Sequence, residues 1–275
     1  MRIEAKQMQP QTGIAEAELH PQFLALGNRR RIAYLCRAAE TDARPGLVWL
    51  GGFMSHMRST KAAFLDEYAA REGRAYLRFD YSGHGESDGA FEAGTIGAWL
   101  EEALAIIRAQ TRGPQILVGS SMGGWLALLA ARAFAQSGEL NRLAGLVLLA
   151  PAVDMTERLI FEKLPPGSRA QLATEGICLF PSAYSDSPYR ISRGLIEEGR
   201  HHLLLDATIR TYCPAHIVHG MNDEDVPWQY AARLVEHLAG DPVVLSLVKD
   251  GDHRLSRPSD LALIVQAIET VTQTQ

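Results

Sequence analysis

A serine between two glycines is the first candidate for chemistry in this sequence. The segment 119–123 reads Gly-Ser-Ser-Met-Gly, so Ser121 is the centre of a Gly-x-Ser-x-Gly pattern. Apolar residues at 115–118 predict a strand before it, and the largely apolar segment 122–135 predicts a buried helix after it. A serine on such a sharp strand-to-helix turn is exposed as a nucleophile, and its neighbours must be small to avoid a clash. The pattern therefore predicts that Ser121 is a catalytic nucleophile.

A serine nucleophile needs a histidine that removes its proton. His253 lies in a loop after the last predicted strand, at the carboxyl edge of the sheet where Ser121 is also expected. His84 and His56 lie in loops at the same edge and are its competitors, whereas His219 ends a predicted strand and is interpreted as a packed structural histidine. Because only the neutral imidazole is a base, activity is expected to fall on acidification.

Three consecutive acidic residues at 223–225 could supply the carboxylate that orients the histidine. They follow the penultimate predicted strand and therefore also lie at the carboxyl edge. The chain order Ser121, Asp223, His253 is the order of nucleophile, acid and histidine expected on a sheet of this kind. The spacing alone leaves Asp225 open as an alternative.

The oxyanion of an acyl-transfer reaction needs two backbone N–H donors. The N–H of Met122, directly after the serine, is the first candidate because it stands at the start of a helix. The glycine-rich turn Leu-Gly-Gly-Phe-Met at 50–54 follows another predicted strand, and the N–H of Phe53 is the second candidate. Gly52, in the same turn, is expected to contact the substrate.

Alternating strands and helices must position these residues. An entry hairpin is expected at 23–26 and 31–37, and the pattern then predicts strands at 47–50, 75–79, 115–118, 143–149, 215–219 and 243–248. Helices are predicted at 59–71, behind Thr95, at 122–135, near Pro227 and from Pro258. This alternation indicates an α/β fold with a mostly parallel sheet and helices on both faces.

The alternation stops over residues 152–207, which hold several prolines, short helical patterns and no clear strand. This segment is interpreted as an inserted helical cap, and residues 1–151 and 208–275 as the core that carries it. Some of its apolar residues are candidates for the wall of an acyl pocket or for the core of the cap itself: Leu159, Ile160, Phe161, Leu164, Leu172, Ile177, Leu179, Phe180 and Tyr184.

Four motifs together resemble the α/β-hydrolase superfamily over residues 30 to 270. They are Gly-x-Ser-x-Gly at 119–123, His-Gly-x-x-Asp-x-x-Val-Pro at 219–227, Gly-Asp-His at 251–253 and Asp-x-x-Gly-x-Gly-x-Ser at 80–87. The resemblance implies the α/β-hydrolase fold, and it selects Asp223 over Asp225 as the acid. It also implies that the loop of Asp80 shapes the mouth of the site. One departure is the turn Leu-Gly-Gly-Phe, which lacks the histidine that many relatives place before the glycine.

Longer runs at 78–87, 113–125, 219–228 and 252–254 are similar to abhydrolase-domain esterases that cleave acyl glucuronides and palmitoyl thioesters. The chain looks like a bacterial relative without a transit peptide. The resemblance implies a serine hydrolase that cleaves carboxylic esters or thioesters of apolar acyl groups through an acyl-enzyme. It implies no metal or organic cofactor, and an ester or acylated thiol as the small-molecule substrate.

Two alternatives remain beside this function. A carbon–carbon bond hydrolase would use the same three residues, whereas dehalogenases and epoxide hydrolases of this fold use an aspartate nucleophile and are not expected in a chain with Ser121. The second alternative is a ligand-binding protein on the same fold that has lost catalysis. A fluorophosphonate probe that labels active serines discriminates it from an enzyme.

Composition excludes several other classes of protein. With a net charge of −5 and no long run of basic residues, a nucleic-acid binder is not expected. The apolar runs are shorter than the roughly 18–20 residues of a spanning helix, so an integral membrane protein is not expected either. Three widely spaced cysteines do not form a disulfide framework. The first twenty residues have no signal-peptide core and include Glu4, Glu16 and Glu18, which favours a cytoplasmic location.

Overall fold

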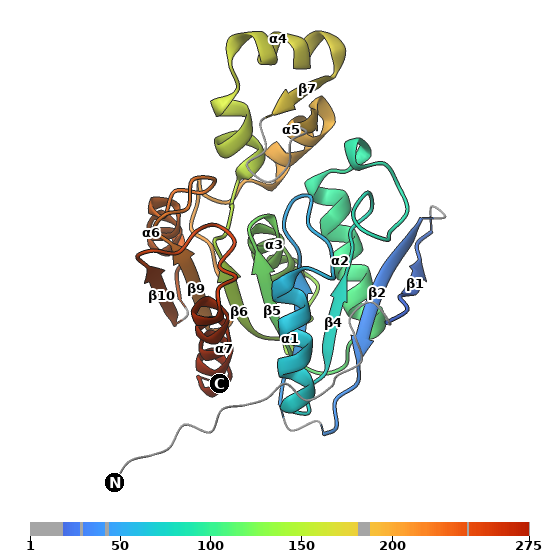
Figure 1. Ribbon diagram of the computed structural model, residues 1–275, viewed down its shortest axis with the longest axis vertical. Helices are drawn as coiled ribbons and strands as arrows, with labels where there is room; N and C mark the ends of the chain where they lie inside the picture. Colours follow the sequence, from blue (N-terminus) through green and yellow to red (C-terminus); the bar gives the residue numbers. More distant parts are fainter. Residues whose placement is uncertain (1–18, 28–29, 42–43, 181–187, 241, 275) are drawn as a thin grey trace.

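The computed structural model describes residues 19–27, 30–41, 44–180, 188–240 and 242–274. Its centre is an eight-stranded sheet with the order β1-β2-β4-β3-β5-β6-β9-β10 (Figure 1). The strands are β1 (Gln22–Ala25), β2 (Arg31–Arg37), β3 (Gly46–Leu50), β4 (Tyr76–Phe79), β5 (Gln115–Ser120), β6 (Leu143–Leu149), β9 (Ala215–Gly220) and β10 (Val243–Val248). β1 pairs antiparallel with β2 and β2 with β4, while the other neighbours are parallel. The predicted α/β-hydrolase fold is confirmed.

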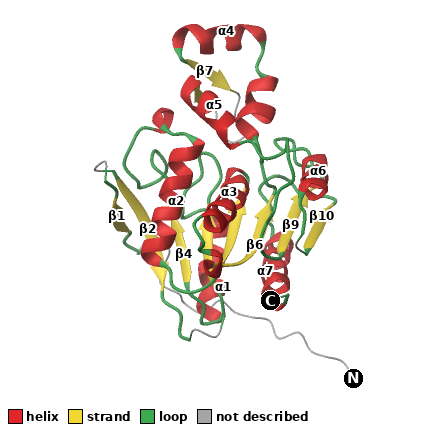
Figure 2. Ribbon diagram, turned by 180° about the vertical axis from the view of Figure 1, so that it is seen from behind, coloured by secondary structure: helices red, strands yellow, loops and turns green. Residues whose placement is uncertain are grey.

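Helices cover both faces of the sheet (Figures 1 and 2). α1 (Thr60–Arg71) and α7 (Pro258–Gln273) pack on one face, and α2 (Ile96–Gln110), α3 (Met122–Gln136) and α6 (Gln229–His237) contribute to the core on the other. The predicted N-cap of α2 is present, because the Thr95 side chain accepts a hydrogen bond from the N–H of Ala98 at 3.2 Å. Every residue of β5 and β6 is buried, which is why these strands read as continuous runs in the sequence.

The elements between β6 and β9 lie outside the main sheet, beyond the ends of its parallel strands (Figure 1). They are the π-helical turn η4 (Thr156–Ile160), η5 (Phe161–Lys163), α4 (Pro166–Glu175), β7 (Ile177–Phe180), β8 (Tyr189–Ser192), α5 (Arg193–Gly199) and η6 (Arg200–His202). The expectation of a cap without strands is wrong, because β7 and β8 form a two-stranded antiparallel sheet. Each strand has only four residues and pairs only with the other, so no long alternating pattern marks it. The division into core and cap at 152 and 207 stays a prediction.

One buried carboxylate holds the two ends of this cap segment together. Asp154 is fully buried, and its two oxygens accept hydrogen bonds from the N–H groups of Leu204 at 2.8 Å and Leu205 at 3.0 Å. Glu198 on α5 accepts a hydrogen bond from the N–H of Gly97, at the start of α2, at 3.0 Å. Asp154 thus closes the base of the cap segment and Glu198 joins the segment to α2, both by charge-assisted hydrogen bonds, which are stronger than neutral ones.

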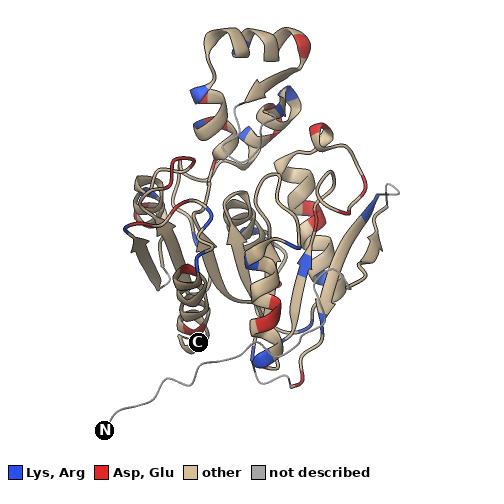
Figure 3. Cartoon of the chain, in the orientation of Figure 1, with Lys and Arg blue, Asp and Glu red and all other residues tan. Residues whose placement is uncertain are grey.

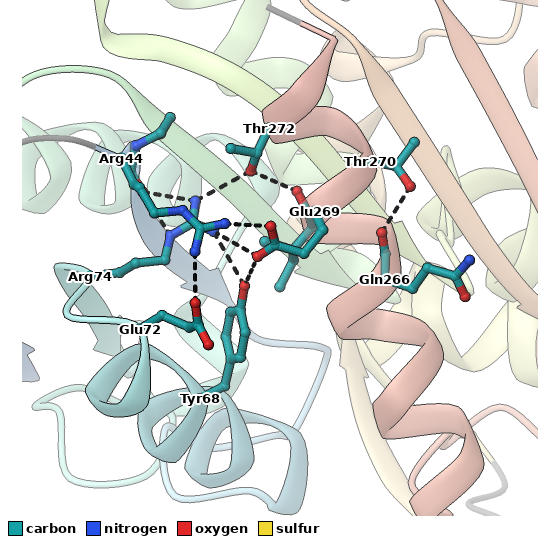
Figure 4. A network of polar contacts seen from close by, with 10 residues as sticks. Arg44, Tyr68, Glu72, Arg74, Gln266, Glu269, Thr270 and Thr272 are labelled. Atoms are coloured by element: carbon teal, nitrogen blue, oxygen red, sulfur yellow. Dashed lines mark hydrogen bonds and ion pairs between the residues drawn. The ribbon is translucent and has the colours of Figure 1, made fainter. Parts of the chain in front are cut away.

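A polar network ties α1 to α7 away from the cap segment (Figure 4). Glu269 on α7 contacts the hydroxyl of Tyr68 on α1 and the guanidinium of Arg44. Arg44 also reaches Glu72 at 2.8 Å, and the buried Arg74 donates to the carbonyl of Pro45. Because buried charges are tolerated only when they are paired, this network fixes the relative position of the two helices.

Charged residues of both signs are interspersed along the chain (Figure 3). Within the part of the chain that the structure describes, no helix is both long and apolar enough to cross a membrane.

Candidate active site

Ser121 stands on a strained turn between β5 and α3. Its backbone has φ 55° and ψ −118°, a conformation that costs a non-glycine residue about 1–3 kcal/mol. A Cβ on Gly119 would lie 2.3 Å from the carbonyl oxygen of Gly123, and a Cβ on Gly123 would lie 2.0 Å from the carbonyl oxygen of Leu50. Both glycines are therefore required for the close approach of backbone around the turn, as the sequence pattern predicts.

Asp223 and His253 form a close pair between the loops after β9 and β10. The Nδ1 of His253 lies 2.7 Å from Oδ2 of Asp223. The other oxygen, Oδ1, accepts hydrogen bonds from the N–H groups of Asp225 at 3.0 Å and Val226 at 2.8 Å. Burial alone raises the pKa of Asp223, but hydrogen bonds from His219 and His253 outweigh it and hold the pKa at about 2. The carboxylate is thus ionised at neutral pH and fixes which imidazole nitrogen carries the proton.

Ser121 and His253 line one cavity of about 740 Å³. Asp225 lines it as well, and the ligand atoms of Asp223, Asp225 and His253 all lie within 4.8 Å of one another. Among the described residues this is the one grouping of three such side chains that could hold a metal ion. Two of these three side chains, Asp223 and His253, contact each other directly at 2.7 Å, and this contact needs no ion to explain it.

The turn that contains Phe53 stands directly beside Ser121. A Cβ on Gly52 would lie 3.2 Å from the carbonyl oxygen of Ser120 and 3.3 Å from the Cβ of Ser121, so the two turns nearly touch. Phe53 lines the cavity, and Met122 is the first residue of α3. The first N–H groups of a helix have no partner within the helix. The N–H groups of Phe53 and Met122 therefore come from the two turns that meet at Ser121.

His84 supports this turn from behind and does not line the cavity. Its Nε2 accepts a hydrogen bond from the N–H of Met54 at 3.2 Å, and its Nδ1 donates to the carbonyl of Ser82 at 3.2 Å. The neighbouring Asp80 accepts from the N–H of Met57 at 2.6 Å. Burial, opposed in part by the hydrogen bond to Ser82, lowers the pKa of His84 to about 4. Of the competing histidines, His84 is thus a neutral support of the turn, and His56 lines the cavity.

The lowered pKa of His84 predicts a pH dependence of stability. The unfolded chain binds a proton on this histidine below pH 6.5, whereas the folded protein does so only below pH 4, so stability falls as the pH drops between these values. The loss amounts to about 3 kcal/mol. In His84→Gln, whose amide oxygen can accept from Met54, this part of the loss is expected to disappear. Denaturant unfolding of both proteins from pH 7 to pH 4 measures it, and parallel curves would contradict it.

Apolar residues of the cap segment form one wall of the cavity. Of the residues proposed from the sequence, Leu159, Ile160 and Phe180 line it. Phe161, Leu164, Leu172, Ile177 and Leu179 are not among its lining residues, and Tyr184 lies outside the described residues. Met155 and Tyr189 also line the cavity and were not predicted. Tyr189 is brought there by the pairing of β8 with β7, in which it faces Phe180.

Polar residues also line the cavity, and most of them were not predicted. They are His56, Arg58, Lys61, Lys163 and Arg254 beside the acidic Glu224 and Asp225. The ammonium group of Lys61 donates to the carbonyl oxygen of Arg254. Burial lowers the pKa of Lys61 to about 8. Arg58, Lys61 and Lys163 lie in segments that no motif marked, whereas His56 and Asp225 were already candidates for other roles.

Comparison with known proteins places this geometry in a family. A family model described as serine aminopeptidase, S33 matches residues 41–184, which is more than half of the chain. The structure of alpha/beta hydrolase domain-containing protein 10 from mouse superposes with a TM-score of 0.82 at 34% identity, covering 93% of this chain and 99% of that one. The chain belongs to the α/β-hydrolase family. As a member, it is a hydrolase.

Two further relatives of this hydrolase span most of its length. A crystal structure of a protein from Agrobacterium vitis S4 is 47% identical with a TM-score of 0.87, covering 92% of this chain and 98% of that chain. The bovine palmitoyl-protein thioesterase ABHD10, mitochondrial, is 40% identical over 228 residues, which are 82% of this chain and 72% of the relative. The predicted resemblance to abhydrolase-domain esterases is confirmed.

The expected cytoplasmic location of this hydrolase is wrong. The bovine relative and its human and mouse counterparts are named as mitochondrial proteins, which points to mitochondria and away from the cytoplasm. The prediction rested on the composition of the first twenty residues, of which 1–18 lie outside the described part of the structure. The composition of one terminal segment does not determine the compartment.

Proposed function

We propose that this hydrolase cleaves carboxylic esters or thioesters by way of an acyl-enzyme on Ser121. Its relatives include proteins named palmitoyl-protein thioesterase. The observation that carries the proposal is the 2.7 Å contact between Nδ1 of His253 and Oδ2 of Asp223, at a cavity that both His253 and Ser121 line. A histidine oriented by a buried carboxylate has its Nε2 available as a base.

In the first half of the reaction, Oγ of Ser121 attacks the carbonyl carbon while Nε2 of His253 removes its proton. The carboxylate of Asp223 stabilises the imidazolium that forms, and its pKa of about 2 keeps it ionised. The N–H groups of Phe53 and Met122 stabilise the oxyanion of the tetrahedral intermediate. His253 then gives the proton to the leaving alcohol or thiol, and the acyl group stays on Ser121.

In the second half, a water molecule attacks the acyl-enzyme. His253 removes a proton from this water and returns it to Oγ of Ser121 as the carboxylic acid leaves. The same two N–H donors serve the second oxyanion, because the acyl carbonyl has not moved. The residues proposed for this cycle need no metal ion and no organic cofactor.

The acyl group is proposed to be apolar, because the cap segment supplies the cavity wall with Met155, Leu159, Ile160 and Phe180. Each methylene buried against these side chains contributes about 0.8 kcal/mol. The polar lining residues of the cavity are then left to the leaving group. If the cavity binds the acyl chain of the transition state more tightly as the chain lengthens, kcat/KM rises with acyl length.

We expect kcat/KM to rise several-fold for each added carbon until the cavity is filled. The measurement uses p-nitrophenyl esters from two to sixteen carbons together with matching thioesters. Phe180→Ala is expected to weaken this dependence. The control is Leu179→Ala on the same strand, because the side chain of Leu179 is 50% exposed and does not line the cavity. A response that does not depend on acyl length would reject the apolar acyl group, and the absence of any ester hydrolysis would reject the function.

A further inference from the structure

His219 is a buried histidine that the reaction proposed above does not use. It is fully buried near the end of β9. Asp223, the proposed acid, lies four residues later, in the loop that follows this strand. Its Nε2 lies 2.9 Å from the carbonyl oxygen of Val226. Because a carbonyl oxygen only accepts hydrogen bonds, Nε2 must carry the proton.

The same Nε2–H also faces the acid of the proposed triad. Nε2 of His219 lies 3.3 Å from Oδ2 of Asp223, which is the oxygen that Nδ1 of His253 approaches to 2.7 Å. The side chains of His219 and Asp223 are both completely buried. The Nδ1 of His219 has no hydrogen-bond partner among the described residues, so a second proton there would be buried without an acceptor. In this arrangement the ring donates from Nε2 toward both acceptors.

We propose that His219 is a positioning residue, whose Nε2–H holds Oδ2 of Asp223 in the place from which this oxygen orients His253. The inference rests on the proposed function, in which Asp223 and His253 act together. Main-chain N–H groups of Asp225 and Val226 hold Oδ1 and do not contact the other oxygen, Oδ2. His219 supplies the contact that fixes it, and His253 then meets an oxygen with one orientation.

The experiment compares two variants of similar polarity. In His219→Gln the amide nitrogen reaches about as far as Nε2, whereas in His219→Asn it stops short of this position. We expect His219→Gln to keep most of the activity and His219→Asn to lose roughly ten- to hundredfold in kcat, the usual effect of losing a hydrogen bond to a charged group. Equal activities of the two variants, both folded by their thermal unfolding, would overturn the proposal.

The pH profile separates positioning from mere packing. Without this contact, Oδ2 of Asp223 is held less firmly against His253 and stabilises its protonated form less, so the acid limb of the kcat/KM profile is expected to move down by about half a pH unit or more in His219→Asn. An unmoved limb would overturn the proposal. Other charged groups around this pair are the same in every variant: Lys61 on α1, Asp225 on the loop after β9, and Asp252 and Arg254 beside His253.

His216 is the matched control, since it is also buried on β9 but its Nε2 contacts Oγ of Ser246 at 2.8 Å. The pair His216→Gln and His216→Asn is expected to leave the acid limb where it is. A second measurement keeps His219 itself unchanged and compares the parent protein with Asp223→Asn. In nitrogen-15 NMR, Asp223→Asn should shift the Nε2–H resonance of His219 and leave that of His216 in place. If the Nε2–H resonance of His219 had the same chemical shift in the parent and in Asp223→Asn, the proposal would also be overturned.

Failure of this inference can be told apart from failure of the proposed function. If the parent neither hydrolyses esters nor reacts with a fluorophosphonate probe, the proposed function fails whatever His219 does. If the parent does both and the His219 variants behave like the His216 variants, only the positioning role is lost.

Discussion

Replacing Ser121 with alanine is expected to lower kcat by about 10⁴- to 10⁶-fold, the usual loss for the nucleophile of a catalytic triad. The loss is large because, in the proposed mechanism, His253 and the two N–H donors act on the nucleophile that Oγ of this residue provides, and Ser121 and His253 line the same cavity. The fold should persist, since the alanine keeps the Cβ and the glycines of the turn are unchanged. Steady-state hydrolysis of a p-nitrophenyl ester measures the effect.

Ser120→Ala is the matched control for this prediction, because Ser120 is the adjacent hydroxyl and also lines the cavity. It is the last residue of β5 and does not share the strained backbone of Ser121. We expect it to stay within about tenfold of the parent. A fluorophosphonate probe should label the parent and Ser120→Ala but not Ser121→Ala. A folded parent that is never labelled would favour a ligand-binding protein over an enzyme.

Asp223→Asn is expected to lower kcat by roughly 10⁴-fold, the size of the effect in the serine-protease example. The amide can present its N–H₂ group to Nδ1 of His253, which stabilises the tautomer with the proton on Nε2. Such a ring cannot remove the proton of Ser121. Loss of the negative charge also leaves the imidazolium without its partner, so kcat falls more than KM rises.

Asp225→Asn is the comparison that decides which acid acts. Asp225 has a carboxylate within 4.8 Å of the same groups, but its backbone N–H donates to Asp223, which makes it a neighbour that supports the acid. We expect Asp225→Asn to cost no more than about tenfold. If both variants were equally impaired, or Asp225→Asn more so, the assignment of Asp223 would be wrong.

Much of the fold and part of the site follow from local sequence. Continuous apolar runs such as Leu143–Leu149 mark strands that are buried on both faces, and Thr95 marks the start of α2 by its cap. The turn of Ser121 is local in part, because Gly119 closely approaches Gly123, whereas the approach of Gly123 to Leu50 involves a distant strand. Where the interacting atoms are close in the chain, a short pattern carries the information.

Other features of the site depend on contacts between distant segments. Asp223 and Asp225 are only two residues apart, so spacing alone does not tell which of them contacts the histidine. The loop after β9 packs against the loop after β10. This packing brings Oδ2 of Asp223 to 2.7 Å from Nδ1 of His253, which is thirty residues away in sequence. His84 and His253 look alike as loop histidines, but burial places His84 behind the turn of Phe53.

The sequence by itself predicted the order of strands and helices and the glycine-flanked turn of Ser121, the proposed nucleophile, since each depends largely on the preferences of a few consecutive residues. Tertiary structure decided the pairing of β7 with β8, the walls of the cavity and the position of His219 at the second oxygen contact of Asp223. These depend on distances between side chains far apart in the chain. Such distances arise only when the whole core packs, because burial and hydrogen bonding are then satisfied together in one arrangement.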